Sequence, residues 1–218
     1  MRHVRSLPPL VVLLAFFAGC ATVEEGRLPE YRRPRAEAIA RAQGGSVEGA
    51  RVAAAALDLV GERNLTVAGR RFNFDCTGTI LAAYYAAGYD LAAGFGAYSG
   101  NGVSRLYAMS EDQGTLRYRE PLKPGDIVFW DNSYDRNGDG RWNDELTHAG
   151  IIVDVSGDGT VTFVHHNYRE GVVTATMNIT RPDDQNRNSP MRMASHRWRA
   201  SDPWLSGELY RAHGALYE

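Results

Sequence analysis

The fold is decided by residues 148–165, which read HAGIIVDVSGDGTVTFVH. The first part of this stretch is mostly apolar, as in a buried strand, and the last part alternates polar and apolar residues. Between them, S-G-D-G at residues 156–159 predicts a tight hairpin turn. Two strands joined by a short turn pair antiparallel, so the stretch predicts the centre of an antiparallel sheet.

Pairing across this hairpin determines which histidines share a face. If the turn takes residues 156–159, Gly150 lies opposite His165. Because side chains alternate between faces, His148 then shares the face of His165 and can reach it on the diagonal. Any even-length loop gives this result, whereas an odd-length loop brings in His166 instead. Two buried histidines on one face need hydrogen-bond partners, which favours a functional pair over an incidental one.

Helices precede the hairpin and further strands surround it. Helical patterns cover Arg51–Val60, Asp75–Gly88 and Val103–Glu111. Strand patterns outside the hairpin cover Ile127–Trp130 and Gly171–Ile179. This order predicts an α+β domain in which N-terminal helices pack on a central antiparallel sheet. The stretch from Trp204 to Leu216 is expected to add one more helix on the outside.

Length and composition limit the class of protein. The chain has 218 residues, of which 44% are hydrophobic and 23% charged, the balance of one soluble globular domain with a short appendage. Its net charge of −2 provides no basic excess to neutralise phosphates, which argues against nucleic acid as a partner. With only two cysteines, Cys20 and Cys76, a disulfide framework is not expected.

Residues 1–19 have the layout of a secretory signal, with positive charges before an apolar run that is too short to span a bilayer comfortably. The stretch F-A-G-C at residues 17–20 resembles the lipobox of bacterial lipoproteins, in which the cysteine is lipidated and becomes the mature N-terminus. Acyl chains on Cys20 would hold the protein at a membrane, and an ordinary cleaved signal with an incidental Cys20 is the alternative. The absence of Asp after Cys20 implies, by the sorting rule for such lipoproteins, an outer membrane location facing the periplasm.

Residues 20–45 are expected to form a tether. They contain prolines, glycines and charges but few large apolar residues. A short helix over residues 35–42 is expected within the tether. The compact domain should then span residues 46–218.

Cys76 falls at the first position of the helix whose N-cap is Asp75. A thiol is a strong nucleophile only as the thiolate, and the partial positive charge and free N–H groups of a helix N-terminus favour an anion. The pKa of the Cys76 thiol is therefore expected to fall. The alternative is a buried structural cysteine without a catalytic role. A nucleophilic thiol also needs a base such as histidine, so Cys76 alone does not decide between the two.

Three sequence blocks, all within residues 46–180, carry a resemblance to a known family. They are F-D-C-T-G at residues 74–78, L-K-P-G-D-I-V-F-W at 122–130 and T-H-A-G-I-I-V at 147–153. In this order they resemble the signature blocks of the NlpC family of papain-like bacterial cell-wall cysteine peptidases. The resemblance implies a papain-like core with Cys76 as nucleophile, His148 as base and His165 as the orienting third residue. It also implies that Asp75 and Thr77 help to hold the substrate, although Thr77 stands where the family has serine.

The implied activity is hydrolysis of peptidoglycan in the cell envelope. Members of the family mostly cut stem peptides between D-glutamate and a diamino acid, with no cofactor for catalysis. A first alternative is an amidase, acyltransferase or thioesterase that uses the same Cys–His pair on another substrate. A second alternative is a catalytically silent, calcium-stabilised lipoprotein that binds cell wall.

Residues 135–145, which read DRNGDGRWNDE, form a second pattern with chemical meaning. The residues that match positions 1, 3, 5 and 6 of an EF-hand calcium loop are Asp135, Asn137, Asp139 and Gly140. The further expected ligands are the Arg141 carbonyl, Asn143 and, with a different wrap, Glu145. Position 12 is Leu146 rather than Glu, and no long flanking helices are predicted. The pattern is compatible with a structural Ca²⁺ site and equally with a polar surface turn.

Overall fold

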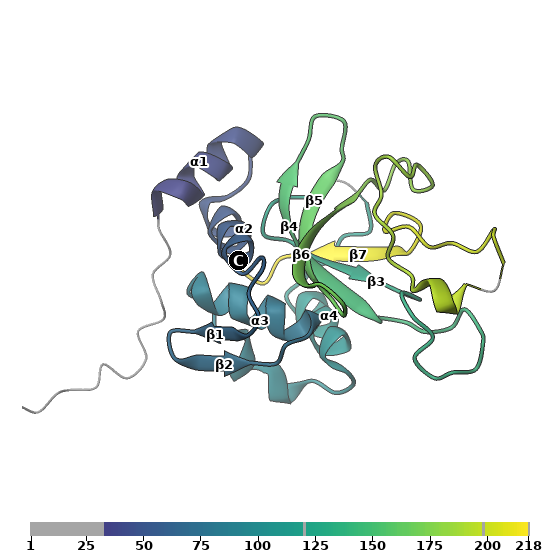
Figure 1. Ribbon diagram of the computed structural model, residues 1–218. Coiled ribbons are helices and arrows are strands. Elements are labelled where there is room, and N and C mark those ends of the chain that lie inside the picture. Colours follow the sequence, from purple (N-terminus) through teal and green to yellow (C-terminus); the bar gives the residue numbers. More distant parts are fainter. Residues whose placement is uncertain (1–32, 120, 198, 218) are drawn as a thin grey trace, which may run out of the picture.

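The computed structural model describes residues 33–119, 121–197 and 199–217, and Figure 1 shows its ribbon. The helices are α1 (Arg33–Gln43), α2 (Val47–Asp58), α3 (Cys76–Ala86) and α4 (Gly102–Asp112), with short 3-10 turns at Leu91–Ala93, Phe95–Ala97 and Ala194–His196. The strands are β1 (Leu65–Val67), β2 (Arg70–Phe72), β3 (Ile127–Trp130), β4 (His148–Val155), β5 (Val161–Asn167), β6 (Gly171–Met177) and β7 (Tyr210–Gly214). The predicted α+β class with an antiparallel sheet is confirmed, but the short strands β1 and β2 come before α3.

Strands β3 to β7 form one antiparallel sheet in the order β6-β5-β4-β3-β7, and β1 and β2 form a separate hairpin. One face of the sheet packs against the helices through a core that includes Ile127, Ala149 and Ile151. The opposite face carries a second core that includes Val128 and Trp130 and is covered by the segment after β6 (Figure 1). Because β3 is buried on both faces, it reads as a continuous apolar run in the sequence.

The β4–β5 hairpin reaches the predicted histidine pairing by an unexpected route. Its first pair is Val155 with Val161, so the loop has odd length. The register then shifts between Ile152 and Asp154, where β4 carries one extra residue. Beyond this bulge Ile151 pairs with Val164, which is the register that an even loop would have given. The odd loop and the bulge cancel, and His165 stays on the His148 face.

Helix α3 begins and ends where the sequence predicts. The Asp75 side chain accepts a hydrogen bond from the Gly78 N–H at 2.7 Å, which caps the first turn and makes Cys76 the first helical residue. At the other end Gly88 has a φ of 100°, a left-handed conformation that glycine adopts without strain. α3 packs on β4 and β5 and also on the β1–β2 hairpin, which the sequence analysis did not predict.

The helix expected over Trp204–Leu216 is wrong. Residues Tyr210–Gly214 form β7, which pairs antiparallel with β3 and places His213 beside Val128. An unpaired edge of the apolar strand β3 would leave its backbone N–H and C=O groups without partners. A long-range pairing of this kind overrides a weak local helix signal.

Part of the expected tether is helical and contacts the domain. α1 packs on α2 through Ala36, Ala40 and Ala50. At its end, the Gln43 side chain donates a hydrogen bond to Asp154 and accepts one from the backbone of β4. The predicted signal over residues 1–19 and the lipidated Cys20 lie outside the described residues. Within the described part of the chain, the helices are too short or too polar to cross a bilayer.

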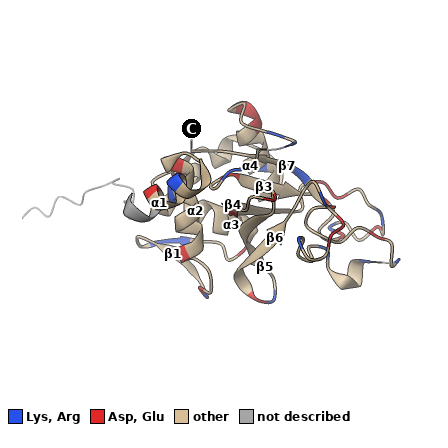
Figure 2. Cartoon of the chain, turned by 90° about the horizontal axis from the view of Figure 1, so that it is seen from above, with Lys and Arg blue, Asp and Glu red and all other residues tan. Residues whose placement is uncertain are grey.

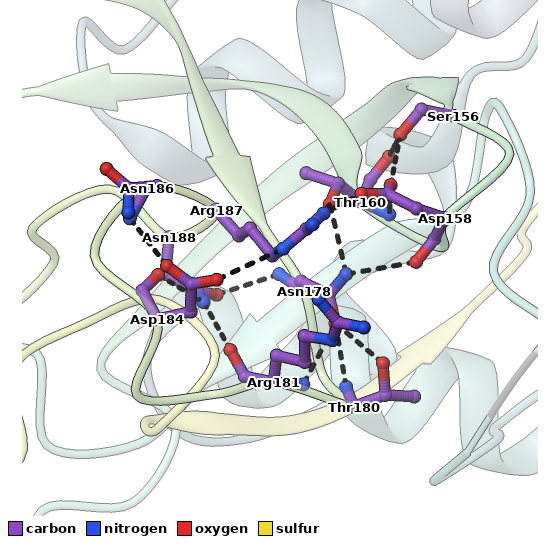
Figure 3. A network of polar contacts seen from close by, with 10 residues as sticks. All are labelled: Ser156, Asp158, Thr160, Asn178, Thr180, Arg181, Asp184, Asn186, Arg187 and Asn188. Carbon is purple, nitrogen blue, oxygen red and sulfur yellow. Dashed lines mark hydrogen bonds and ion pairs between the residues drawn. The ribbon is translucent and has the colours of Figure 1, made fainter.

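A polar network joins the tip of the β4–β5 hairpin to the loop after β6, as Figure 3 shows. Asn178, 1% exposed, donates from its side-chain amide to the Asp158 carbonyl and the Thr160 hydroxyl, and accepts from the turn that follows it. Arg187 makes ion pairs with the carboxylates of Asp158 and Asp184. Both carboxylates are paired with the same arginine, so we interpret the network as a structural brace for the loop that covers the second core.

Candidate active site

His148 and His165 form a direct pair on neighbouring strands. Nε2 of His148 lies 2.9 Å from Nδ1 of His165, and the two rings meet edge to face. Trp130 packs beside the His148 ring and Phe163 beside the His165 ring, with centroid distances of 5.8 and 5.2 Å. These aromatic walls hold the two imidazoles in one orientation. His166 points to the helix-covered side, where its ring contacts Phe74.

The hydrogen bond allows two tautomeric arrangements, and one of them leaves His148 able to act as a base. His165 is 6% exposed, and burial lowers the pKa of its imidazole to about 4, so it is neutral at physiological pH. A neutral His165 can accept at Nδ1 from a protonated Nε2 of His148. This tautomer leaves Nδ1 of His148 unprotonated and free to take a proton from another group.

Cys76 lies against the first residues of β4. The backbone N–H of Ala149 and both the N–H and the hydroxyl of Thr77 lie near the sulfur and favour its thiolate form, which lowers the pKa of the thiol. The sulfur and the His148 imidazole therefore flank the same short backbone segment. Within the residues that the structure describes, no hydrogen bond joins the Cys76 sulfur to His148. Both side chains are half-buried, which leaves them accessible from solution.

The electrostatics of the thiol differ from the expected helix-terminus effect. Burial, and after it the neighbouring carboxylate of Asp75, raise the pKa of Cys76, although donors from Ala149 and Thr77 oppose the shift. Burial also holds the pKa of His148 well below its ordinary value, and positive charge on His165 or His166 would lower it further. The expectation of a lowered thiol pKa is thus wrong in sign. The resting pair is a neutral thiol and a neutral imidazole.

Glycines allow the close packing around the nucleophile. A Cβ on Gly78 would stand 1.9 Å from the Asn73 carbonyl oxygen, and a Cβ on Gly102 would stand 2.3 Å from the Thr77 hydroxyl. The first turn of α3 is therefore packed closely between Asn73, which follows β2, and the start of α4. The N–H of Cys76 has no hydrogen-bond partner among the described residues, so it is available to an oxygen of a bound substrate.

Two pockets flank the N-terminus of α3. The first, about 360 Å³, is lined by both predicted substrate-binding residues, Asp75 and Thr77, together with Phe95 and Arg105. The second, about 410 Å³, lies on the other side of Asn73, between the β1–β2 hairpin and Phe74. The larger cavity beside the network of Figure 3 lies at the hairpin tip and contains none of the candidate catalytic residues.

Tyr134 is a site residue that the sequence analysis missed. Burial raises the pKa of the Tyr134 phenol, and a negative charge on Cys76 would raise it further, so the two groups interact electrostatically. The loop that carries Tyr134 is tied to the residue before His148, because the Ser133 hydroxyl bonds to the Thr147 hydroxyl at 2.8 Å. Leu146 has a φ of 51°, an unfavourable conformation for leucine, directly before this anchor. The local sequence predicts neither the interaction of Tyr134 with Cys76 nor the hydrogen bond between Ser133 and Thr147.

The loop predicted to bind calcium has some of the required groups turned inward. The carboxylate of Asp135 accepts from the N–H groups of Gly138 and Gly140 at 2.8 and 3.0 Å. The side chains of Asn137 and Asn143 both contact the carboxylate of Asp139, which also accepts from the Arg141 N–H. Glu145 turns away and pairs with Arg211 at 3.5 Å. The described residues contain no group of three or more Asp, Glu, His or Cys side chains arranged for a metal.

A carboxylate oxygen that accepts one hydrogen bond keeps a second lone pair, so the loop amides do not exclude a cation. If Ca²⁺ binds this loop, removing it with a chelator is expected to lower the melting temperature by roughly 5 °C, because a ligand bound to the native state alone stabilises it. Thermal melts with chelator and with added Ca²⁺ test this, with Asp135→Ala as the variant that should not respond. Equal melting temperatures in all conditions would exclude the calcium site.

The chain was also compared with known proteins. Models of protein families, curated proteins and solved structures gave no match.

Proposed function

We propose that this chain is a cysteine hydrolase of the bacterial cell wall with a papain-like core, in which Cys76 attacks and His148 is the base. The observation that carries the proposal is the 2.9 Å hydrogen bond between His148 and His165, beside a thiol at a helix N-terminus that contacts Ala149. A nucleophile, a base and a group that orients the base are the three parts that thiol catalysis needs.

Proton transfer comes first in the proposed mechanism. Nδ1 of His148 takes the proton of the Cys76 thiol when a substrate binds, since catalytic contacts are often long in a free enzyme and shorten in the complex. The imidazolium then donates its Nε2–H to Nδ1 of the neutral His165. The raised pKa of the thiol supports a general-base step over a standing ion pair.

The thiolate then forms a bond to the carbonyl carbon of an amide. The N–H of Cys76 is the available donor for the oxygen that becomes negative. The protonated His148 gives its proton to the leaving amine as the C–N bond breaks. Water, deprotonated by His148, hydrolyses the acyl-enzyme and restores the thiol.

The proposed substrate is the peptidoglycan stem peptide, cut between D-glutamate and a diamino acid, and the test is product identity. The mature protein is incubated with purified muropeptides, and the products are analysed by mass spectrometry. The proposal requires stem peptides shortened at this bond. Release of products cut only at another amide would indicate a different amidase, and unchanged muropeptides would reject the proposal.

The proposed location is the outer membrane, with a lipid on Cys20 as the anchor. Replacement of Cys20 by serine is expected to move the protein from the membrane fraction to the soluble fraction of cell extracts, because the acyl chains supply the membrane affinity. Immunoblots of the two fractions measure the change. Unaltered membrane partitioning of the variant would reject lipidation at this residue.

His165 acts on the reaction only through His148. Replacing His165 with leucine is expected to lower kcat about 100-fold, because His148 loses the acceptor that sets its tautomer and stabilises its charge. Replacing it with asparagine should retain more activity, since the amide oxygen can accept from Nε2. Steady-state assays of the two variants make the comparison, and equal losses would mean that the acceptor has no role.

A further inference from the structure

The pocket on the β1–β2 side of the nucleophile is cationic. Its only charged lining residues are Arg63 and Arg71, and the rest of its wall includes Asn73 and Phe74. Arg71 lies on β2, and Arg63 lies just before β1. Figure 2 shows blue along this hairpin, beside the β1 label.

Neither arginine has a partner within the described part of the chain. Other arginines in the fold do: Arg70, next to Arg71, makes an ion pair with Asp90 at 2.8 Å, and Arg211 makes one with Asp131 at 2.9 Å. Both Arg63 and Arg71 are exposed, so they remain free to bind a ligand from solution. Two unpaired guanidinium groups on one pocket form a site for an anion with two oxygens, such as a carboxylate.

The pocket is adjacent to the candidate nucleophile. Asn73 and Phe74 form its wall and lead directly into Asp75, the cap of α3. Asn73 is fixed in place by the first turn of α3, where its carbonyl meets Gly78. Phe74 is held by the edge-to-face contact with His166, at a centroid distance of 4.5 Å. A peptide whose amide carbonyl lies at Cys76 can therefore extend a neighbouring group into this pocket.

We infer that Arg63 and Arg71 bind a carboxylate of the substrate and select peptides that carry one next to the scissile bond. The inference rests on the proposed function and adds a specificity-determining pair to it. A stem peptide offers two such groups, one on each side of the bond: the α-carboxylate of a γ-linked D-glutamate, and the additional carboxylate of diaminopimelate. The arginine chemistry is the same for both.

Binding to the inactive full-length Cys76→Ala protein tests the inference without turnover. Calorimetry is carried out with L-Ala-γ-D-Glu-diaminopimelate, with the peptide in which D-isoglutamine replaces D-glutamate, and with the peptide in which L-lysine replaces diaminopimelate. The dissociation constants are compared with and without the double change Arg63→Ala and Arg71→Ala. Arg41→Ala, which removes one arginine from an exposed position on α1, is the control for each of the two changes.

The double variant should bind the fully carboxylated peptide about 100-fold more weakly, roughly tenfold for each charge-assisted contact, and Arg41→Ala should have no effect. One of the two neutralised peptides should bind weakly to the parent and be insensitive to the double change, which identifies the carboxylate. The double change to lysine should restore part of the affinity.

Equal dissociation constants in parent and double variant, the same loss for all three peptides, or no binding of any peptide would each overturn the inference. Turnover by the protein with Cys76 intact is measured separately. Arginine-dependent binding without cleavage would reject the proposed hydrolysis and leave the carboxylate site standing.

Discussion

Replacing Cys76 with alanine is expected to reduce hydrolysis by about 10⁵-fold or more, because the thiol is the group that forms the covalent intermediate in the proposed mechanism. The fold should survive the change. Cys76 is half-buried at the first turn of α3, and the turn is held by the Asp75 cap rather than by the thiol. The measurements are turnover of a stem peptide and a thermal melt of the same sample, whose midpoint should change by only a few degrees.

Two companion variants make this result specific to the thiol. Cys76→Ser keeps the size and hydrogen bonding of the side chain but supplies a much weaker nucleophile, so its activity should also be close to zero. His148→Gln places a polar amide at the base position that cannot take up a proton, and it should inactivate the protein although Cys76 is intact. Activity of Cys76→Ala near that of the parent would place the nucleophile elsewhere and remove the proposed function.

Acid is expected to destabilise the fold, with most of the loss between pH 6.5 and pH 4. Burial lowers the pKa of His165 and of His213 from the usual 6.5 to about 4. His213 is 1% exposed on β7, outside the candidate site. Its Nε2 donates to the Pro121 carbonyl, which leaves Nδ1 to accept from the Tyr210 hydroxyl at 2.7 Å. The neutral ring thus satisfies both contacts, and nearby Arg117 and Lys123 oppose a further positive charge.

The sign follows from proton binding. Below pH 6.5 the unfolded chain binds a proton at each of these histidines and the folded chain does not, so unfolding becomes more favourable as the pH falls. The contribution is fully present above pH 6.5, is lost as the pH falls to about 4, and changes little below that value. A shift of this size corresponds to roughly 3 kcal/mol for each histidine.

Denaturant titrations at pH 7, 5.5 and 4 measure this effect. His213→Gln, which keeps a donor and an acceptor but does not titrate, should give a shallower pH dependence than the parent. An unfolding free energy that is constant from pH 7 to pH 4 would mean that burial does not lower the pKa values of His165 and His213. A steep dependence that His213→Gln leaves unchanged would assign the effect to His148 and His165.

The pairing of His148 with His165 was predictable in part from the local sequence pattern. The sequence predicted the two strands and the shared face of the two histidines, because alternation along a strand is a local property. It did not predict the odd loop or the bulge in β4, since a bulge is placed by packing of the strand against its neighbours. The prediction of the pair is confirmed, but the loop length assumed for it is wrong.

The N-terminal end of α3 was predictable for a similar reason. Asp75 caps the helix through a bond to a residue three positions later, and Gly88 ends it by its own conformation, so both signals lie within the segment. The electrostatic interaction of Tyr134 with Cys76 involves segments that are far apart in the chain. β7 is likewise decided by the open edge of β3 rather than by its own residues.

By itself, the sequence determined the α+β class with a central antiparallel sheet, the helix start that presents Cys76 and the common face of His148 and His165. These features depend on side-chain periodicity, capping and turn residues, which act over a few positions. Only the tertiary structure decided the direction of the Cys76 pKa shift, the place of Tyr134 and the unpaired arginines beside the nucleophile. Burial, the approach of charges and the lack of a partner are properties of the whole packed chain, and no local stretch of residues contains them.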